Sequence, residues 1–169
     1  MVLRLATWNV NSLRRRLDHL ARFAAEAEPD LICLQETKVT DAQFPRAALQ
    51  AMGYPHLLVH GQKGTNGVAI LSRLPFKAQG TKVWCGRDDR RHAYVRLPGG
   101  PMCPMKRVNI NDLWYYRYRQ AFARDYGCCL DHVLVTPQIE ASLAGFRVVR
   151  ETRAWDRPSD HVPLVLDLE

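Results

Sequence analysis

Apolar residues along the chain fall into short stretches that either alternate with polar residues or run together without a break. Alternation at every second residue is typical of a strand with one buried face, and a short unbroken apolar run is typical of a strand buried on both faces. The strands predicted in this way cover residues 2–7, 31–34, 57–60, 68–71, 82–85, 93–97, 130–135, 146–149 and 162–168.

Helical spacing is rarer and lies mostly early in the chain. Leu13, Leu17, Leu20 and Phe23 recur at helical spacing, and Ser12 precedes them as a candidate N-cap. Arginines at positions 14–16 oppose the dipole of that helix, so they favour either an external anion or a solvated basic face. Two further short helical segments are predicted over residues 42–52 and 139–143.

Length and pattern together predict a single domain over residues 1–169. The chain has 169 residues, of which 47% are hydrophobic, and a chain of this length buries roughly two-thirds of its unfolded surface without a disulfide or metal. Many strands with few helices favour a mixed α/β sandwich over a doubly wound parallel sheet. Residues 98–113 hold three prolines and two glycines and lack an amphipathic pattern, so we predict an atypical junction there.

The sequence indicates neither a membrane span nor a secretory leader. No apolar run approaches the ~18 residues that a spanning helix needs, and the first residues, MVLRLATWNV, have a strand pattern. We therefore expect a cytoplasmic protein with no membrane partner. The cysteine number is odd and no CxxC pair occurs, so free thiols are expected. The cysteines are Cys33, Cys85, Cys103, Cys128 and Cys129.

The net charge of the chain is +7, and the calculated isoelectric point is about 9.4. A basic surface attracts phosphates and releases counterions, which favours a polyanion such as nucleic acid as the partner. Solubility alone is the alternative explanation. Charge therefore needs an accompanying site before it indicates a function.

Polar residues gather where the predicted strands begin or end, and loops converge at such places to form ligand sites. Glu36 and Asp160 offer hard oxygen ligands, which suit Mg²⁺ or Mn²⁺ rather than zinc, and asparagine amides can add neutral oxygens. Asp131 can pair with His161 and hold its imidazole. The polar residues at strand ends are Asn9, Asn11, Glu36, Lys38, Asp131, Asp160 and His161.

Each of these acids also has a structural interpretation. Glu36 can simply pair with Lys38 or with a nearby arginine, and Asp160 follows Pro158 and Ser159 in a typical turn sequence. Four strand ends that carry Asn, Glu, Asp and Asp-His are nevertheless hard to explain by packing alone. The sequence therefore predicts a divalent metal site built from segments that lie far apart along the chain.

Five segments resemble, in order, the successive motifs of the exonuclease III and abasic-site endonuclease family, which belongs to the DNase I-like superfamily. The segments are TWNVNSLRRRL, PDLICLQETKV, GQKGTNGVAILSR, LDHVLVTP and RPSDHVPLVLDL. The resemblance covers residues 3–97 and 114–168. It implies an α/β fold, namely a DNase I-like four-layer α/β/β/α sandwich, and Mg²⁺-dependent (or Mn²⁺-dependent) cleavage of phosphodiesters in double-stranded DNA, at abasic sites and 3′ ends.

The resemblance also implies roles for individual residues. Glu36 and Asp160 would hold the metal, with Asn9 and Asn11 beside it. His161 would contact the scissile phosphate and Asp131 would orient it, which makes this pair the catalytic candidates. The residues implied to contact DNA are Lys38, Lys63, Asn66 and Trp114.

The middle of the family pattern is absent from this chain. Members carry a Tyr-x-Pro-Asn-Gly motif, two helices and a Gly-Asp-x-Asn motif with the general base, and neither motif occurs here, so no general base is assigned. Thr65, Cys128 and Cys129 stand where members carry aromatic residues or arginine. We therefore expect a sandwich that is incomplete in its middle, with exposed sheet edges through which copies of the chain associate.

Three functions remain open from the sequence. The first is a DNA-repair phosphodiesterase with 3′→5′ exonuclease and abasic-site endonuclease activity. The second is a catalytically impaired, shortened relative that binds DNA without turnover, which the missing Gly-Asp-x-Asn motif favours. The third is a phosphatase of the same superfamily that acts on a small phosphoester or lipid phosphate.

Overall fold

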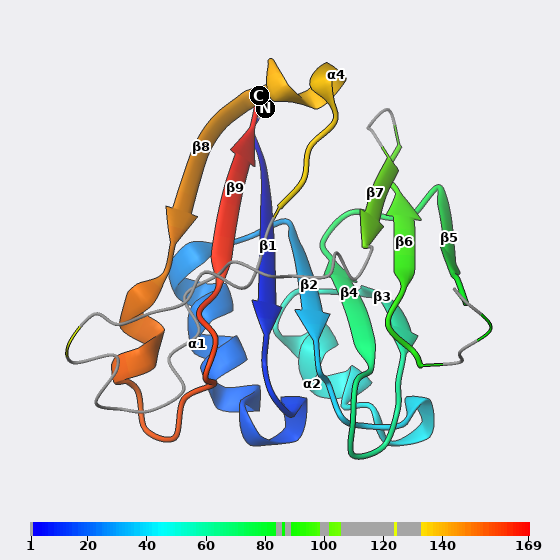
Figure 1. Cartoon of the computed structure of the whole chain (residues 1–169), viewed down its shortest axis with the longest axis vertical. Coiled ribbons are helices and arrows are strands. Elements are labelled where there is room, and N and C mark those ends of the chain that lie inside the picture. Colours follow the sequence, from blue (N-terminus) through cyan, green and yellow to red (C-terminus); the bar gives the residue numbers. More distant parts are fainter. Residues whose placement is uncertain (1, 84–85, 87–88, 99–101, 106–123, 125–132) are drawn as a thin grey trace.

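The structure is a computed structural model, and it describes residues 2–83, 86, 89–98, 102–105, 124 and 133–169. A large sheet has the strand order β3-β4-β2-β1-β9-β8, and a small sheet has the order β5-β6-β7 (Figure 1). The strands of the large sheet are β1 (Leu3–Asn9), β2 (Leu31–Gln35), β3 (His56–His60), β4 (Val68–Ser72), β8 (Leu143–Val148) and β9 (Leu164–Leu168). The strands of the small sheet are β5 (Ala78–Thr81), β6 (Ala93–Arg96) and β7 (Met102–Met105).

The strand directions bring four distant loops to one end of the large sheet. β1 and β2 are parallel, so the residues that follow both strands lie at the same end. β9 and β4 run antiparallel to them, with Leu164 opposite Thr7 and Val68 opposite Gln35. The loop before β9 and the loop before β4 therefore reach that same end, which is the lower end in Figure 1.

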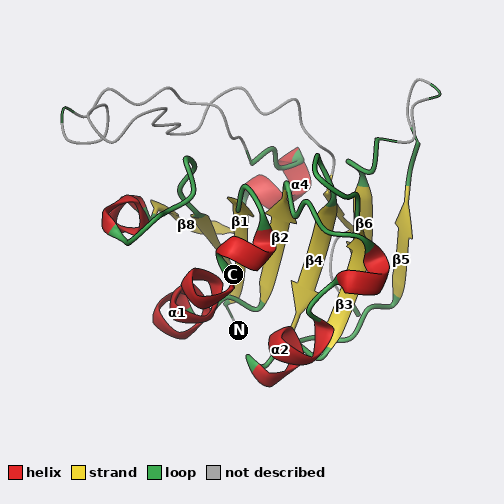
Figure 2. Cartoon of the chain, turned by 90° about the horizontal axis from the view of Figure 1, so that it is seen from below, coloured by secondary structure: helices red, strands yellow, loops and turns green. Residues whose placement is uncertain are grey.

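A helical layer covers one face of the large sheet (Figure 2). α1 is amphipathic and buries Leu20 and Phe23 against Trp8 of β1, with the Trp8 and Phe23 rings 5.5 Å apart at an edge-to-face angle. This core fixes the position of β1, whose last residue is Asn9. The helical segments are η1 (Leu13–Arg15), α1 (Leu17–Ala27), η2 (Asp41–Gln43), α2 (Arg46–Ala51), α4 (Pro137–Glu140) and η3 (Arg150–Ala154).

The small sheet packs on the other face of the large sheet through a second apolar cluster. Leu31 and Cys33 of β2 and Ile70 of β4 face Ala93 and Val95 of β6 in this cluster, and all five are buried. A helical layer, the large sheet and the small sheet thus follow one another, as the predicted α/β sandwich requires. None of the helices in the described part of the chain has the length and apolar character of a membrane span.

Several predicted elements differ from those observed. β5 ends at Thr81, and residues 82 and 83 lie outside any strand, although a strand was predicted over 82–85; residues 84 and 85 lie outside the described ones. β5 is an exposed edge strand with a polar sequence, so it shows no apolar alternation. Val133, Leu134 and Val135 lie outside any strand, although a strand was predicted over 130–135; its first three residues lie outside the described ones. Ser12 precedes η1 without a side-chain cap, and α1 begins only at Leu17.

Candidate functional site

The ends of β1 and β2 place an amide beside a carboxylate. Asn9 is the last residue of β1, is 8% exposed, and donates from Nδ2 to Oε1 of Glu36 at 3.0 Å. Its own side-chain oxygen accepts the backbone N–H of Asn11 at 3.1 Å. The buried amide therefore holds Glu36 and also shapes the loop that follows β1.

Asn11 extends this network to the loop before β9. Its Nδ2 donates to Oδ1 of Asp160 at 2.9 Å, and its Oδ1 accepts a hydrogen bond from the Lys38 ammonium at 2.5 Å. The same ammonium lies 3.0 Å from Oε2 of Glu36. Glu36, Asn9, Asn11 and Lys38 thus form a closed polar ring, to which Asp160 is attached through Asn11. We call these five residues the carboxylate ring.

The pKa of Glu36 lies below its ordinary value. Partial burial raises this pKa, but hydrogen bonds from Asn9 and Lys38, the charge of Lys38 and the charge of His161 together outweigh burial. The side chain of Glu36 is still 38% exposed, so solvent reaches it. Glu36 is therefore an ionised, reachable carboxylate at neutral pH.

The backbone around the carboxylate ring adopts unusual conformations. The φ values of Asn11, Glu36 and Lys38 are 42°, 51° and 54°. They lie in the left-handed region, which residues other than glycine rarely adopt. Hydrogen bonds that cross between loops hold them there, including Ser12 N–H to the Glu36 carbonyl at 2.8 Å and Lys38 N–H to the Asn66 carbonyl at 3.0 Å. Such conformations cost on the order of 1–3 kcal/mol each and cluster at functional sites.

Ser159 fixes the segment that carries Asp160 and His161. The Ser159 side chain is completely buried, and its hydroxyl donates to the carbonyl of Asn9 at 2.6 Å. The same oxygen accepts the backbone N–H of His161 at 3.3 Å, and the His161 carbonyl accepts the indole N–H of Trp8 at 3.2 Å. Asp160 and His161 are thereby anchored to the end of β1.

Two arginines hold the same segment by hydrogen bonds to its backbone carbonyls. Arg153 is 8% exposed and donates to the carbonyl of Ser159 at 2.6 Å. Arg16 donates to the carbonyls of Asn11 and Pro158. The sequence analysis considered Arg16 only as part of an anion site or a basic face, and it assigned no role to Ser159 or Arg153. Their contacts are to backbone carbonyls, which leave no motif in the sequence.

The loop between β3 and β4 packs directly on the residues after β2. Its Gly67 has φ +79° and accepts the backbone N–H of Thr37 at 3.1 Å. Asn66 has φ 48° and receives the Lys38 N–H, whereas Lys63 is exposed at the surface of the loop. The predicted DNA-contacting residues Lys38, Lys63 and Asn66 therefore belong to two loops joined by backbone hydrogen bonds.

The structure brings most of the predicted site residues together. Asp131 and Trp114 lie outside the described residues, so the Asp131–His161 pair and the role of Trp114 stay predictions. Within the described ranges, no three or more His, Cys, Asp or Glu residues gather into a metal-binding group. The predicted site residues at this end of the sheet are Asn9, Asn11, Glu36, Lys38, Lys63, Asn66, Asp160 and His161.

The donor set of the carboxylate ring fits a hard divalent cation. Two carboxylates with amide oxygens nearby are the ligands that Mg²⁺ and Mn²⁺ prefer, and the Lys38 ammonium already lies between oxygens of Glu36 and Asn11. The amide nitrogens of Asn9 and Asn11 face the two carboxylates, so in this arrangement the asparagines hold the carboxylates in place. Metal binding through their oxygens stays a prediction.

Comparison with known proteins shows the family to which the chain belongs. The family model described as endonuclease/exonuclease/phosphatase family matches residues 6–161. Exodeoxyribonuclease III of Haemophilus influenzae is 41% identical over 71 residues, which are 42% of this chain and 26% of the relative. An exodeoxyribonuclease of Bacillus subtilis is 38% identical over 74 residues, which are 42% of this chain and 28% of the relative. The aligned stretch thus spans about a quarter of the length of these curated relatives.

Solved structures of similar fold cover nearly the whole chain. The 3′ phosphatase NExo from Neisseria, bound to a product DNA hairpin, has a TM-score of 0.85 and 24% identity, with 99% of each chain covered. An AP endonuclease from Archaeoglobus fulgidus has a TM-score of 0.85 and 22% identity, also with 99% of each chain covered. These similarities confirm the α/β, DNase I-like fold class predicted from the sequence.

Proposed function

Because the chain belongs to the endonuclease/exonuclease/phosphatase family, and within that family is similar to exodeoxyribonuclease III over 71 residues, we propose that it is a DNA-repair phosphodiesterase. The proposed activities are 3′→5′ exonuclease and abasic-site endonuclease cleavage of double-stranded DNA, with Mg²⁺ or Mn²⁺ as cofactor. The observation that supports this proposal most is the carboxylate ring, which joins Glu36 after β2 to Asp160 before β9.

Glu36 and Asp160 are the residues that would hold the divalent cation, with Asn9 and Asn11 setting their positions. Such a cation would supply positive charge that stabilises the negative charge developing on the phosphate in the transition state. The Glu36 carboxylate, whose pKa lies below its ordinary value, is ionised at neutral pH, as metal binding requires. His161 would contact the scissile phosphate and be oriented by Asp131. Water would attack phosphorus, the P–O bond to one of the two sugars would break, and that sugar oxygen would leave and take up a proton.

DNA would lie across the loops that surround the carboxylate ring. Lys63 is exposed on the loop before β4, Lys38 is a ring member, and Asn66 receives the Lys38 N–H. A chain with net charge +7 attracts a phosphate backbone and loses affinity as salt rises. Trp114 completes the proposed contacts, beside an abasic site.

Cleavage of a duplex that contains one abasic site tests the proposed function. In the presence of Mg²⁺ we expect the parent chain to cut the duplex, and we expect Glu36→Gln to lose at least about a hundredfold in rate, because a group that stabilises transition-state charge is worth this much. Chelation of the metal with EDTA serves as the matched chemical control. Equal cleavage by the parent chain and by Glu36→Gln would remove the proposal.

A second candidate function is DNA binding without cleavage, which the missing Gly-Asp-x-Asn motif favours. The same abasic duplex distinguishes the two functions. Binding that weakens steeply with salt, without cut product, would support the binding module. Hydrolysis of a small phosphoester without hydrolysis of DNA would instead indicate a phosphatase.

Association between copies of the chain and a cytoplasmic location complete the proposal. β8 lies at an edge of the large sheet, with Leu143 41% exposed and Phe146 56% exposed. Exposed apolar edge strands favour pairing with another chain. Sedimentation of the purified protein at several concentrations measures this association directly, and a single monomeric species at every concentration would contradict it.

A further inference from the structure

The guanidinium of Arg16 joins two loops that are far apart in the sequence. Its Nη1 donates to the carbonyl of Asn11, in the loop after β1, and its Nη2 donates to the carbonyl of Pro158 at 3.0 Å, in the loop before β9. The planar fork of an arginine reaches two acceptors at once with a fixed separation. Arg16 therefore spans the gap between these loops as one rigid unit.

The two loops that Arg16 joins carry the donor and the acceptor of one hydrogen bond in the carboxylate ring. Asn11 donates from its side chain to Asp160 at 2.9 Å. Arg16 binds the backbone carbonyl of Asn11 itself and the carbonyl of Pro158, two residues before Asp160. Fixing these two carbonyls restricts the distance between the Asn11 amide and the Asp160 carboxylate.

The contacts of Ser159 and Arg153 do not directly restrict the distance between the Asn11 amide and the Asp160 carboxylate. Ser159 anchors the Asp160 segment to the carbonyl of Asn9 at 2.6 Å, and Arg153 donates to the carbonyl of Ser159 at 2.6 Å. Neither contact involves Asn11, whose backbone is in the left-handed region with φ 42°. Arg16 bonds directly to the backbone of Asn11 and to the backbone of the Asp160 segment, which neither Ser159 nor Arg153 does.

Arg16 is held in this place at an energetic cost. Burial lowers the pKa of its guanidinium, the positive charge of Arg15 lowers it further, and the charge of Asp160 opposes both effects. A partly buried cation that hydrogen bonds to two carbonyls is more costly than an exposed one.

We propose that Arg16 is a positioning residue, which sets the separation of Asn11 and Asp160 and thereby the affinity of the carboxylate ring for a divalent cation. This inference rests on the proposed function, because it names a residue that tunes the same metal site. Arg16 acts through the backbone of its neighbours and touches neither metal nor phosphate. Lysine cannot replace it, since a single ammonium cannot span two separated carbonyls with a rigid fork.

Mn²⁺ binding without DNA, followed by electron paramagnetic resonance, tests this role. We expect Arg16→Lys to weaken Mn²⁺ binding by about tenfold, as loss of a supporting contact behind a metal site typically does. Arg73→Lys is the matched control, because Arg73 is exposed, follows β4 at the other end of the sheet and lies over the Tyr54 ring. Unchanged Mn²⁺ affinity in a folded Arg16 variant overturns the proposal.

Hydrogen exchange in the metal-free protein gives a second readout. The Asn11 N–H donates to Asn9, so loss of the Arg16 contact should speed its exchange in Arg16→Lys but not in Arg73→Lys. Equal exchange rates at Asn11 in the parent chain and Arg16→Lys overturn the proposal whether or not Mn²⁺ binds. A parent chain that binds no Mn²⁺ contradicts the proposed function instead. Arg16→Gln replaces Arg16→Lys if the latter does not fold, with the same expected results.

Discussion

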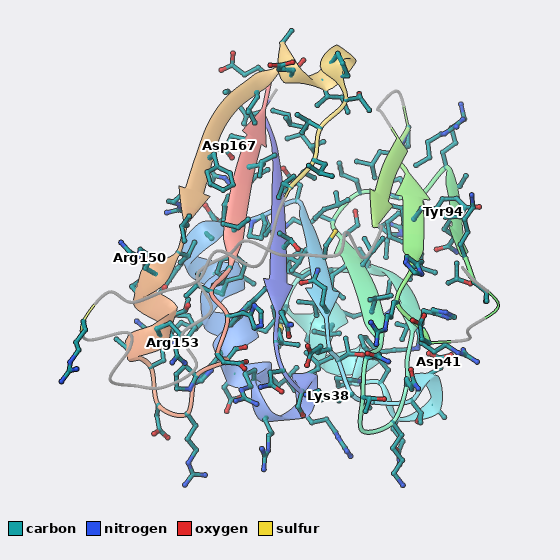
Figure 3. The ribbon with its side chains drawn as sticks, viewed as in Figure 1. Lys38, Asp41, Tyr94, Arg150, Arg153 and Asp167 are labelled. Carbon is teal, nitrogen blue, oxygen red and sulfur yellow. The ribbon has the colours of Figure 1, made fainter. Side chains whose placement is uncertain are left out.

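The two ends of the large sheet both carry charged side chains, but they neutralise them in different ways. At the end marked by Asp167 in Figure 3, Arg4 Nε lies 2.7 Å from one Asp167 oxygen and Arg4 Nη2 lies 3.3 Å from the other. At the end marked by Lys38, Asp160 accepts its hydrogen bond from the neutral amide of Asn11. One carboxylate is thus matched by a guanidinium and the other by an amide.

This difference distinguishes a structural carboxylate from a candidate metal ligand. A carboxylate in fork geometry with arginine has its charge compensated and its lone pairs occupied. A carboxylate held by neutral donors keeps a negative charge that an external cation can compensate. This criterion separates Asp160 from Asp167 only, because Glu36, the other proposed metal ligand, lies 3.0 Å from the Lys38 ammonium, the pairing that its structural interpretation predicts.

The same substitution at both ends should separate their roles, and this is the largest effect that we expect. Asp160→Asn removes a proposed metal ligand, so abasic-site cleavage should fall by at least about a hundredfold. Asp167→Asn removes a partly exposed ion pair, so it should cost about 1 kcal/mol or less in the free energy of unfolding and leave cleavage intact. Cleavage rates and urea unfolding of both variants make the comparison. A similar loss of cleavage in Asp160→Asn and Asp167→Asn would contradict the different roles assigned to the two ends.

Tight packing of the loop before β4 should make Gly67 sensitive to substitution. An added Cβ would lie 2.5 Å from the Thr37 hydroxyl, and φ is +79° there. Gly67→Ala should therefore lower the free energy of unfolding by about 1–3 kcal/mol. Gly64→Ala is the control for the positive φ alone, since φ is +80° and nothing lies within 4 Å of the added Cβ. If urea unfolding shows equal losses for both variants, the close contact with Thr37 contributes nothing.

The far end of the sheet should respond to alkaline pH through Tyr54, and this effect is the smallest. Burial raises the pKa of Tyr54, partly opposed by Arg73, and its hydroxyl donates to the Pro29 carbonyl at 2.9 Å. Because the folded pKa lies above the unfolded one, this stabilising contribution is complete below about pH 10 and is lost as pH rises further.

Tyr54→Phe should remove this part of the alkaline dependence of stability. At neutral pH the same change should cost about 1 kcal/mol through the lost hydrogen bond. Urea unfolding of both proteins between about pH 8 and pH 11 spans the ionisation of tyrosine in the unfolded chain. An identical slope of stability against pH for the parent chain and Tyr54→Phe would show that Tyr54 ionises equally in both states.

Sequence patterns predicted the buried parts of the fold better than its edges. β2 and β4 are buried along their whole length, so their apolar runs stand out, whereas β5 is an exposed edge strand with a polar sequence and was misplaced. At the site, Glu36 and Asp160 were predicted because they follow or precede apolar strands. Arg16 was considered only as part of an anion site or a basic face, because its partners are backbone carbonyls that only the folded chain brings together.

The central claim is that Glu36 and Asp160 bind the same divalent cation, and calorimetric titration with Mn²⁺ tests it most directly. Two carboxylates that share one ion cannot each bind it independently, so their contributions to affinity should not add. We expect one Mn²⁺ per parent chain, and we expect Glu36→Gln, Asp160→Asn and the double variant to lose this binding to a similar extent. Two separate Mn²⁺ sites, each abolished by one of the single substitutions and unaffected by the other, would contradict the claim.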